Sequence, residues 1–242
     1  MIRATSIFEK TSSAFQLSLL SKTARAIRRE NLTYLSVSKL RHLEKTLHDI
    51  HNRGIAGDFL EFGVALGGSA ILIARAAQVS GRTFTGFDIF GTIPPPTSDK
   101  DDVKSKERYR TIAEGKSQGL GGDPYYGYRE DLYSDVVRTF SRYGLTVDTK
   151  GIALEKGLFQ DTWPHWKTRP IAFVHIDCDW YEPVRYCLDV VRDLLVPGGA
   201  ILLDDYHDYG GAQVATQEFL AEHYNFTFED GANVVLRRGD SN

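Results

Sequence analysis

The sequence predicts an α/β protein with a mostly parallel, seven-stranded sheet covered by helices on both faces, a Rossmann-like three-layer sandwich. Two observations lead to this prediction. Short apolar runs alternate with helical segments along most of the 242 residues, an order typical of parallel strands joined by helical crossovers. Near the C-terminal end, two short β-rich segments flank Asp230-Gly231, a dipeptide that favours a tight hairpin turn. The hairpin predicts that one edge strand runs antiparallel.

The composition fits one ordinary globular domain. Hydrophobic residues make up 42% of the chain and charged residues 25%, enough for a sizeable core. The net charge of -3 and the pI near 6.2 give no electrostatic indication of nucleic-acid binding. The two cysteines, Cys178 and Cys187, form no CxxC motif, so a cytoplasmic location is expected. No apolar run reaches the roughly 20 residues of a membrane-spanning helix.

Residues 1–52 are expected to form a helical extension before the main domain. Within residues 32–52, Leu40, Leu43, Leu47 and Ile50 recur at three- to four-residue intervals, as on the buried face of a helix. Residues 1–30 carry arginines and serines but few acids, so a transit peptide is an alternative to an amphipathic helix. We expect the amphipathic helix, packed on the domain or on a second subunit.

The main domain, residues 53–242, is predicted to supply the alternating elements. Strands are predicted at 58–64, 82–90, 150–156, 171–176 and 200–203, helices at 69–79, 130–143, 183–195 and 211–223, and hairpin strands at 226–229 and 234–237. Residues 157–161 and 197–199 are expected to form turns. Residues 91–127, rich in proline, glycine and charge, are too long for an ordinary connection. They are predicted to be a lid over the strand ends or a solvated surface excursion, with a possible helix at 98–110.

Acidic residues follow two neighbouring strands of this sheet. Asp177 and Asp179 come after the strand 171–176, and Asp204 and Asp205 come after 200–203. Because ligands collect where parallel strands end, these carboxylates are expected to meet there, and like charges at close range need a cation. Oxygen ligands suit Mg²⁺, with Mn²⁺ or Ca²⁺ as alternatives. His207, just beyond the second pair, is a candidate base or substrate contact.

A glycine loop follows the first strand and opens a helix, as a cofactor loop does. Its first position is the acid Glu61, which would repel a pyrophosphate but suits a cationic amino group. Asp88 ends the next strand, where a carboxylate can accept ribose hydroxyls, so the pair favours S-adenosylmethionine over NAD. The alternative is a plain turn with a helix-capping serine. The cofactor candidates are Glu61, Gly63, Val64, Gly67, Gly68, Ser69 and Asp88.

Four stretches carry a family resemblance: GIAGDFLEFGVALGGSA, GLFQDTWP, HIDCDWYEPV and VPGGAILLDDYHDYGGAQVA. On these stretches, within residues 54–220, the chain resembles the macrocin O-methyltransferase family (TylF, MycF and NovP type). This family of class I S-adenosylmethionine-dependent methyltransferases methylates sugar hydroxyls in antibiotic biosynthesis. The resemblance implies the class I methyltransferase fold, and it makes a homodimer plausible.

The resemblance also implies roles for single residues. Mg²⁺ would be held by Asp177, Asp204 and Asp205, and Asp177 would also accept the proton of the substrate hydroxyl. Trp180 stands where the similar catechol-type enzymes have a lysine base, so the catechol mechanism is not expected.

For the cofactor, the resemblance implies that Glu61 and Gly63 contact the methionine part and Asp88 the ribose. Phe159 and Gln160 would lie against the adenine.

The expected function is therefore Mg²⁺-dependent O-methylation of a small hydroxylated molecule, a sugar or a sugar-bearing natural product. A phenolic or other small hydroxylated acceptor is one alternative. A non-catalytic cofactor-binding protein of the same fold is the other. Neither nucleic acid nor membrane is an expected partner.

Overall fold

The computed structural model describes residues 17–147, 151–166 and 169–239. Its seven strands are β1 (Asp58–Phe62), β2 (Phe84–Asp88), β3 (Ile152–Lys156), β4 (Ile171–Ile176), β5 (Leu195–Leu203), β6 (Phe226–Glu229) and β7 (Val234–Arg238). They form one sheet in the order β3-β2-β1-β4-β5-β7-β6. The first five strands are mutually parallel where they pair. The predicted seven-stranded, mostly parallel sheet is confirmed.

The C-terminal hairpin is present, but the prediction of an antiparallel edge strand was wrong. β7 pairs antiparallel with both β5 and β6, so the reversed strand lies inside the sheet and the edge strand β6 runs with the parallel set. Burial explains why β7 rather than β6 lies inside the sheet. Val234, Val235 and Leu236 are fully buried, while three of the four β6 residues are exposed.

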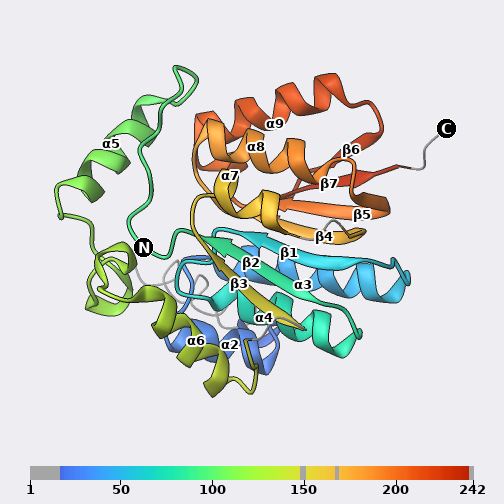
Figure 1. Cartoon of the computed structure of the whole chain (residues 1–242), viewed down its shortest axis with the longest axis horizontal. Helices are drawn as coiled ribbons and strands as arrows, with labels where there is room; N and C mark the ends of the chain where they lie inside the picture. Colours follow the sequence, from blue (N-terminus) through green and yellow to red (C-terminus); the bar gives the residue numbers. More distant parts are fainter. Residues whose placement is uncertain (1–16, 148–150, 167–168, 240–242) are drawn as a thin grey trace, which may run out of the picture.

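Helices cover both faces of the sheet, which gives three layers (Figure 1). One core joins the sheet to α2 (Lys22–Arg29), α3 (Val37–Asn52), α4 (Gly68–Val79) and α6 (Leu132–Arg142). The other core joins it to α8 (Tyr181–Val191) and α9 (Gly210–Glu222), with the short helix α7 (Phe159–Thr162) packed against it. α7 replaces the turn predicted at 157–161.

The observed starts of two elements differ from the predicted starts for identifiable reasons. α3 begins at Val37 rather than at 32, because the Ser36 side chain caps it by accepting the Lys39 N–H. β5 begins at Leu195, since the expected turn at residues 197–199 is an irregularity inside the strand. The register jumps there from Ile171↔Leu195 to Phe173↔Ala200. Residues 1–16 and Lys150 lie outside the described residues.

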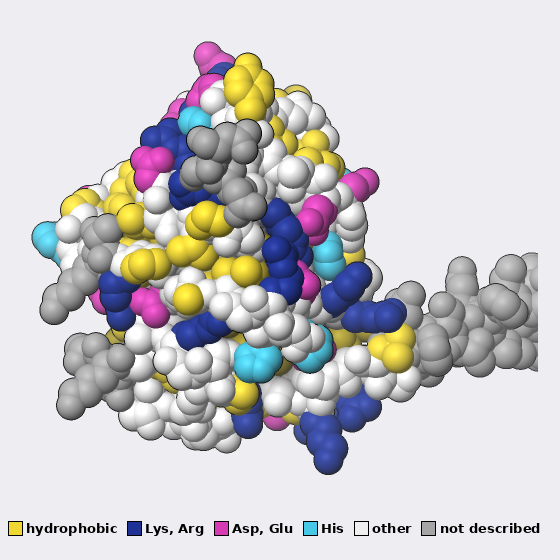
Figure 2. All heavy atoms as spheres, turned by 90° about the vertical axis from the view of Figure 1, so that its right-hand side faces the viewer, with side chains coloured by type: hydrophobic (Ala, Val, Ile, Leu, Met, Phe, Trp, Pro, Cys, Tyr) yellow, Lys and Arg dark blue, Asp and Glu magenta, His cyan; other side chains and the backbone are white. Residues whose placement is uncertain are grey.

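The segment 91–127 is separate from the three layers and contains α5 (Val103–Ala113), as the sequence allowed (Figure 1). The face on the right of Figure 1 carries hydrophobic side chains interspersed with basic and acidic ones (Figure 2). In the described part of the chain, no helix has the length and apolar character needed to cross a membrane.

Candidate active site

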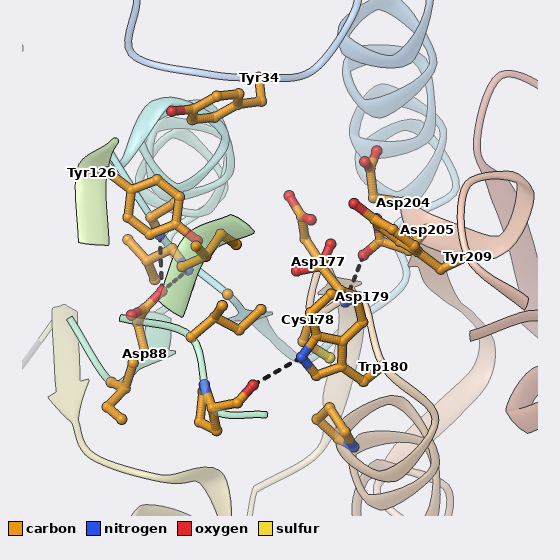
Figure 3. A pocket seen from close by; sticks show the side chains of 18 of the residues that line it. Tyr34, Asp88, Tyr126, Asp177, Cys178, Asp179, Trp180, Asp204, Asp205 and Tyr209 are labelled. Atoms are coloured by element: carbon orange, nitrogen blue, oxygen red, sulfur yellow. Dashed lines mark hydrogen bonds between the residues drawn. The ribbon is translucent and has the colours of Figure 1, made fainter. Parts of the chain in front are cut away.

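The carboxyl ends of the central strands border one cavity of about 570 Å³. The strand order reverses between β1 and β4, the position at which open α/β sheets bind ligands. Figure 3 shows Asp88 and Tyr126 on one side of the cavity and the acidic cluster with Tyr209 on the other. Of the predicted residues, the cavity is lined by Gly63, Val64, Gly68, Ser69, Asp88, Phe159, Gln160, Asp177, Asp179, Asp204 and Asp205.

The glycine loop passes directly against the first acidic loop. Gly63 has φ +92°, and a Cβ atom at this position would collide with the main chain of Asp177. Hydrogen bonds continue the sheet on both sides, from the Gly63 N–H to Phe87 O and from the Asp177 N–H to Phe62 O, each 2.9 Å long. Glycine is therefore required where β1 and β4 leave the sheet.

The next two glycines serve packing around the start of α4. Gly67 has φ +88° and caps the helix without lining the cavity. A Cβ on Gly68 would lie 2.4 Å from Leu32 O, so the loop before α3 sits against the helix start. Ser69 is buried and lines the cavity. The cap is Gly67 rather than the serine.

Asp88 is tied to the glycine loop by its carboxylate. Oδ2 accepts the Val64 N–H (2.7 Å) and the Ala65 N–H (2.9 Å), while Oδ1 accepts the Phe90 N–H. Burial raises the pKa of Asp88, and the three N–H groups only partly offset it. The carboxylate thus fixes the shape of the loop from the end of β2. Oδ2 accepts two N–H groups and Oδ1 only one, so Oδ1 keeps a lone pair for a further donor.

Glu61 does not line the cavity, in contrast to its neighbour Gly63. It is fully buried beside His175, with 2.8 Å between Glu61 Oε1 and His175 Nδ1. Glu61 Oε2 and His175 Nε2 are buried and have no hydrogen-bond partner among the described residues. Glu61 Oε2 is therefore available to a cationic amino group, but only one that reaches past the residues lining the cavity.

Three carboxylates meet at the other end of the cavity. Asp177, Asp204 and Asp205 each offer an oxygen, and these three oxygens lie within 4.8 Å of one another. Burial raises the pKa of Asp177 well above its usual range, and Asp204 and Asp205 raise it further. Burial also raises the pKa of Asp205, together with Asp179 and Asp204. Such a group stays ionised only if a cation neutralises it.

Lys39 of α3 supplies one cation to this cluster. Its Nζ lies 2.7 Å from Asp204 Oδ2 and 2.6 Å from Asp208 Oδ2, and it also donates to Asp204 O. Burial alone would lower the pKa of Lys39, but the two ion pairs outweigh burial and raise it. Lys39 therefore remains charged and offsets part of the acidic cluster.

The cluster fits a hard divalent cation. The other Asp204 oxygen accepts the side-chain N–H of the buried Asn233 at 2.7 Å, which orients the carboxylate as an outer partner of a metal ligand does. Each Asp204 oxygen keeps a second lone pair. No hydrogen bond joins the Asp177 carboxylate to another residue that the structure describes. An all-oxygen set of this kind suits Mg²⁺.

Asp179 belongs to the same loop but has a different position. Its φ is +60°, unusual for a residue with a side chain, and its N–H donates to Asp205 Oδ2 at 2.9 Å. Burial raises its pKa to about 7, against the opposing influence of Arg108. The main chain of Asp179 thus orients one member of the cluster.

Two consecutive acids attach segment 91–127 to the helices behind the cluster. Asp101 Oδ1 accepts the N–H of Tyr181, the first residue of α8, at 2.8 Å. Asp102 Oδ2 accepts the N–H of Gly210, the first residue of α9, at 2.9 Å. Asp102 Oδ1 also caps α5 through the Ser105 N–H. One dipeptide therefore links α5 to both helices that follow the acidic loops.

Trp180 belongs to the site, whereas Trp163 and His207 do not. Trp180 lines the cavity and donates from Nε1 to Pro94 O at 2.9 Å. Trp163 packs on Phe62 and Phe87 and does not line the cavity. His207 lies outside the lining and points to Asp230, with 3.1 Å between Nε2 and Oδ1. The structure does not bring His207 to the predicted site.

Several residues of the site gave no interpretable signal in the sequence. Lys39 and Asn233 come from elements far along the chain from the acids, so only the fold brings them together. Asp102 precedes a helical segment and could have been found as an N-cap. Other cavity residues that were not foreseen include Tyr34, Lys104, Arg108, Tyr125, Tyr126, Asp208 and Tyr209.

The chain is similar to known O-methyltransferases. A family model described as macrocin O-methyltransferase (TylF) matches residues 11–120 and 124–227. The 8-demethyl-8-(2,3-dimethoxy-alpha-L-rhamnosyl)-tetracenomycin-C 4'-O-methyltransferase of Streptomyces olivaceus is 28% identical over 191 residues, which are 74% of this chain and 67% of that protein. The mycinamicin III 3''-O-methyltransferase of Micromonospora griseorubida is 28% identical over 177 residues, 72% of this chain and 65% of that protein. The chain spans about two thirds of the length of these relatives.

Solved structures share the fold. The O-methyltransferase NovP superposes with a TM-score of 0.70 at 24% identity, covering 86% of this chain and 82% of NovP. The calicheamicin methyltransferase CalS11 gives a TM-score of 0.59 at 18% identity, with 90% and 92% covered.

Proposed function

The chain belongs to the macrocin O-methyltransferase family, and from this premise we propose that it transfers a methyl group from S-adenosylmethionine to a hydroxyl of a sugar or sugar-bearing natural product. The observation that carries the proposal is the meeting of the glycine loop and the three-carboxylate cluster in one cavity. The names of the matched relatives support the acceptor class, because one describes a rhamnosyl-bearing compound and another mycinamicin III.

Cofactor binding is assigned to the β1 and β2 side of the cavity. Gly63, Val64, Gly68 and Ser69 would face the methionine part, with Glu61 below them. Asp88 would accept ribose hydroxyls while it holds the loop, and Phe159 with Gln160 would lie against the adenine. The binding of S-adenosylmethionine or its product in solved proteins of this fold supports the assignment.

Asp177, Asp204 and Asp205 are the proposed ligands of Mg²⁺. When bound, the ion supplies positive charge that lowers the pKa of an acceptor hydroxyl. Asp177 is also the proposed proton acceptor, since its carboxylate is free of hydrogen bonds to described residues and lines the cavity. Lys39 and Asn233 hold Asp204 in place. The protein then aligns the acceptor oxygen with the methyl group, and alignment is a large part of such catalysis.

Segment 91–127 is the proposed lid of the acceptor side. α5 lies beside the acidic loops because Asp101 and Asp102 tie it to α8 and α9. Trp180, in the position of the catechol-type lysine, is buried and donates its indole N–H to Pro94 O of this segment. An indole nitrogen is a donor only, so Trp180 cannot act as a base. A homodimer and a cytoplasmic location remain proposals, and light scattering of the purified protein tests the first.

An acceptor screen with labelled S-adenosylmethionine tests the function. The purified protein is incubated with sugars, glycosides and phenols, each with MgCl₂ and with EDTA. We expect labelled methyl ethers of sugar hydroxyls only when Mg²⁺ is present. Transfer only to phenols would replace the acceptor class, and undiminished transfer in EDTA would overturn the metal assignment.

A further inference from the structure

Two basic residues of α5 face the acceptor side of the cavity. Lys104 and Arg108 both line it, and a spacing of four residues places them on the same face of the helix. Lys104 Nζ lies 4.9 Å from the ring centre of Tyr209 and donates to Asp208 O. Tyr209 in turn bonds through its N–H to Asp205 O. Lys104 therefore borders the acidic cluster, and Arg108 is near enough to Asp179 that its charge lowers the pKa of that carboxyl.

Neither cation has an acidic partner in the structure. Within residues 17–147, 151–166 and 169–239, no carboxylate lies within 4.0 Å of Lys104 Nζ or of the Arg108 guanidinium. Lys39, the third cation of the cavity, differs in being paired with Asp204 and Asp208. Two unpaired cations are thus left at the cavity's outer side.

The Arg108 side chain is held in place before any ligand arrives. Its guanidinium lies over the buried Tyr125 ring, 5.4 Å from the ring centre, and NH1 donates to Ser117 Oγ at 2.9 Å. A guanidinium has five N–H donors, and this is the one hydrogen bond that joins it to a described residue. The remaining donors are available in a fixed orientation, which suits a phosphate or carboxylate.

From this arrangement we propose that the acceptor carries an anionic group, a phosphate or carboxylate attached to the sugar, which binds Lys104 and Arg108 while the hydroxyl lies at the acidic cluster. The inference rests on the proposed methyl transfer and adds a specificity to it. The competing explanation is that both cations only compensate the charge of the acids.

A pair of acceptors that differ in one anionic group separates the explanations. Rhamnose 1-phosphate and methyl rhamnoside are compared with wild-type protein, Arg108→Gln, Lys104→Gln and the control Lys106→Gln, an exposed residue of α5 outside the cavity lining. We expect wild type to prefer the phosphate. Arg108→Gln should raise the KM of rhamnose 1-phosphate about ten- to a hundredfold. The KM of methyl rhamnoside and the Kd of S-adenosylmethionine should stay within about twofold of their wild-type values.

Equal effects on both acceptors, or a wild-type preference for methyl rhamnoside, would overturn the inference while leaving methyl transfer established. If neither sugar is methylated, the proposed function fails for these acceptors, and binding decides the inference separately. Calorimetric titration of the S-adenosylhomocysteine complex should then show tighter binding of rhamnose 1-phosphate than of methyl rhamnoside, lost in Arg108→Gln. No difference between the two ligands would refute it.

Discussion

A Cβ atom on Gly63 would lie 1.8 Å from the carbonyl oxygen of Asp177. The main chain of Gly63 therefore lies directly against that of Asp177, where the proposed cofactor loop at the end of β1 meets the proposed metal loop at the end of β4. The two halves of the site therefore meet through their main chains at this point, where side-chain rotation cannot change their separation.

Gly63→Ala should weaken both folding and cofactor binding. The methyl group meets main chain, and φ +92° is unfavourable for alanine, so about 3 to 5 kcal/mol of unfolding free energy should be lost. The control is Gly81→Ala, at φ +67° with open space around its Cβ position, for which about 1 to 2 kcal/mol is expected. Urea unfolding and titration with S-adenosylmethionine measure the effects. Similar losses in both variants would disprove the contact.

Asp205→Asn should remove turnover but not cofactor binding. Outer partners of metal ligands typically contribute about 10- to 100-fold, so the loss of a ligand should cost at least about 100-fold in kcat. The Kd of S-adenosylmethionine should stay within about threefold, because Asp205 lies on the opposite side of the cavity from Asp88 (Figure 3). Asp208→Asn, outside the three-carboxylate cluster, serves as the control. Full activity of Asp205→Asn in EDTA contradicts the metal site.

Lys39→Met should destabilise the metal-free protein more than the Mg²⁺-loaded protein. Removing one partner of a largely buried ion pair leaves Asp204 uncompensated, which costs about 3 kcal/mol. Mg²⁺ would restore part of that charge balance. Thermal unfolding in EDTA and in MgCl₂ measures the difference, with Lys45→Met, an exposed lysine of the same helix, as the control. A Tm decrease that is identical in both buffers would argue against a shared site.

Asp102→Ala should loosen segment 91–127 without unfolding the domain. The variant loses the α5 cap, worth about 1 kcal/mol, and the bond to Gly210 of α9. Amide hydrogen exchange in 91–127 should accelerate about tenfold, and the KM of the acceptor should rise. Asp131→Ala removes a cap within α6 only, so it should leave exchange in 91–127 unchanged. Equal exchange in both variants would remove the anchoring role of Asp102.

Most of the fold was predictable because it depends on local pattern. The apolar run 171–176 was located to the residue as β4, and the helix after it differed only in its ends. The errors arose where a long-range contact overrode the local signal. Pro197-Gly198-Gly199 reads as a turn, but pairing with β4 keeps it within β5. The hairpin predicted the reversal but not that β7 would take the inner position.

The sequence by itself determined the acids at the strand ends and the glycine loop, since both follow directly from apolar runs whose ends converge in a parallel sheet. It could not determine what surrounds them. Lys39 reaches Asp204 across 165 positions of the chain, Asn233 reaches it from the hairpin, and Lys104 and Arg108 arrive on a helix outside the sheet layers. Such neighbours are set by packing between distant elements, which leaves no periodic trace in the sequence. For that reason the tertiary structure alone decided which charges in the cavity are paired and which remain free for a substrate.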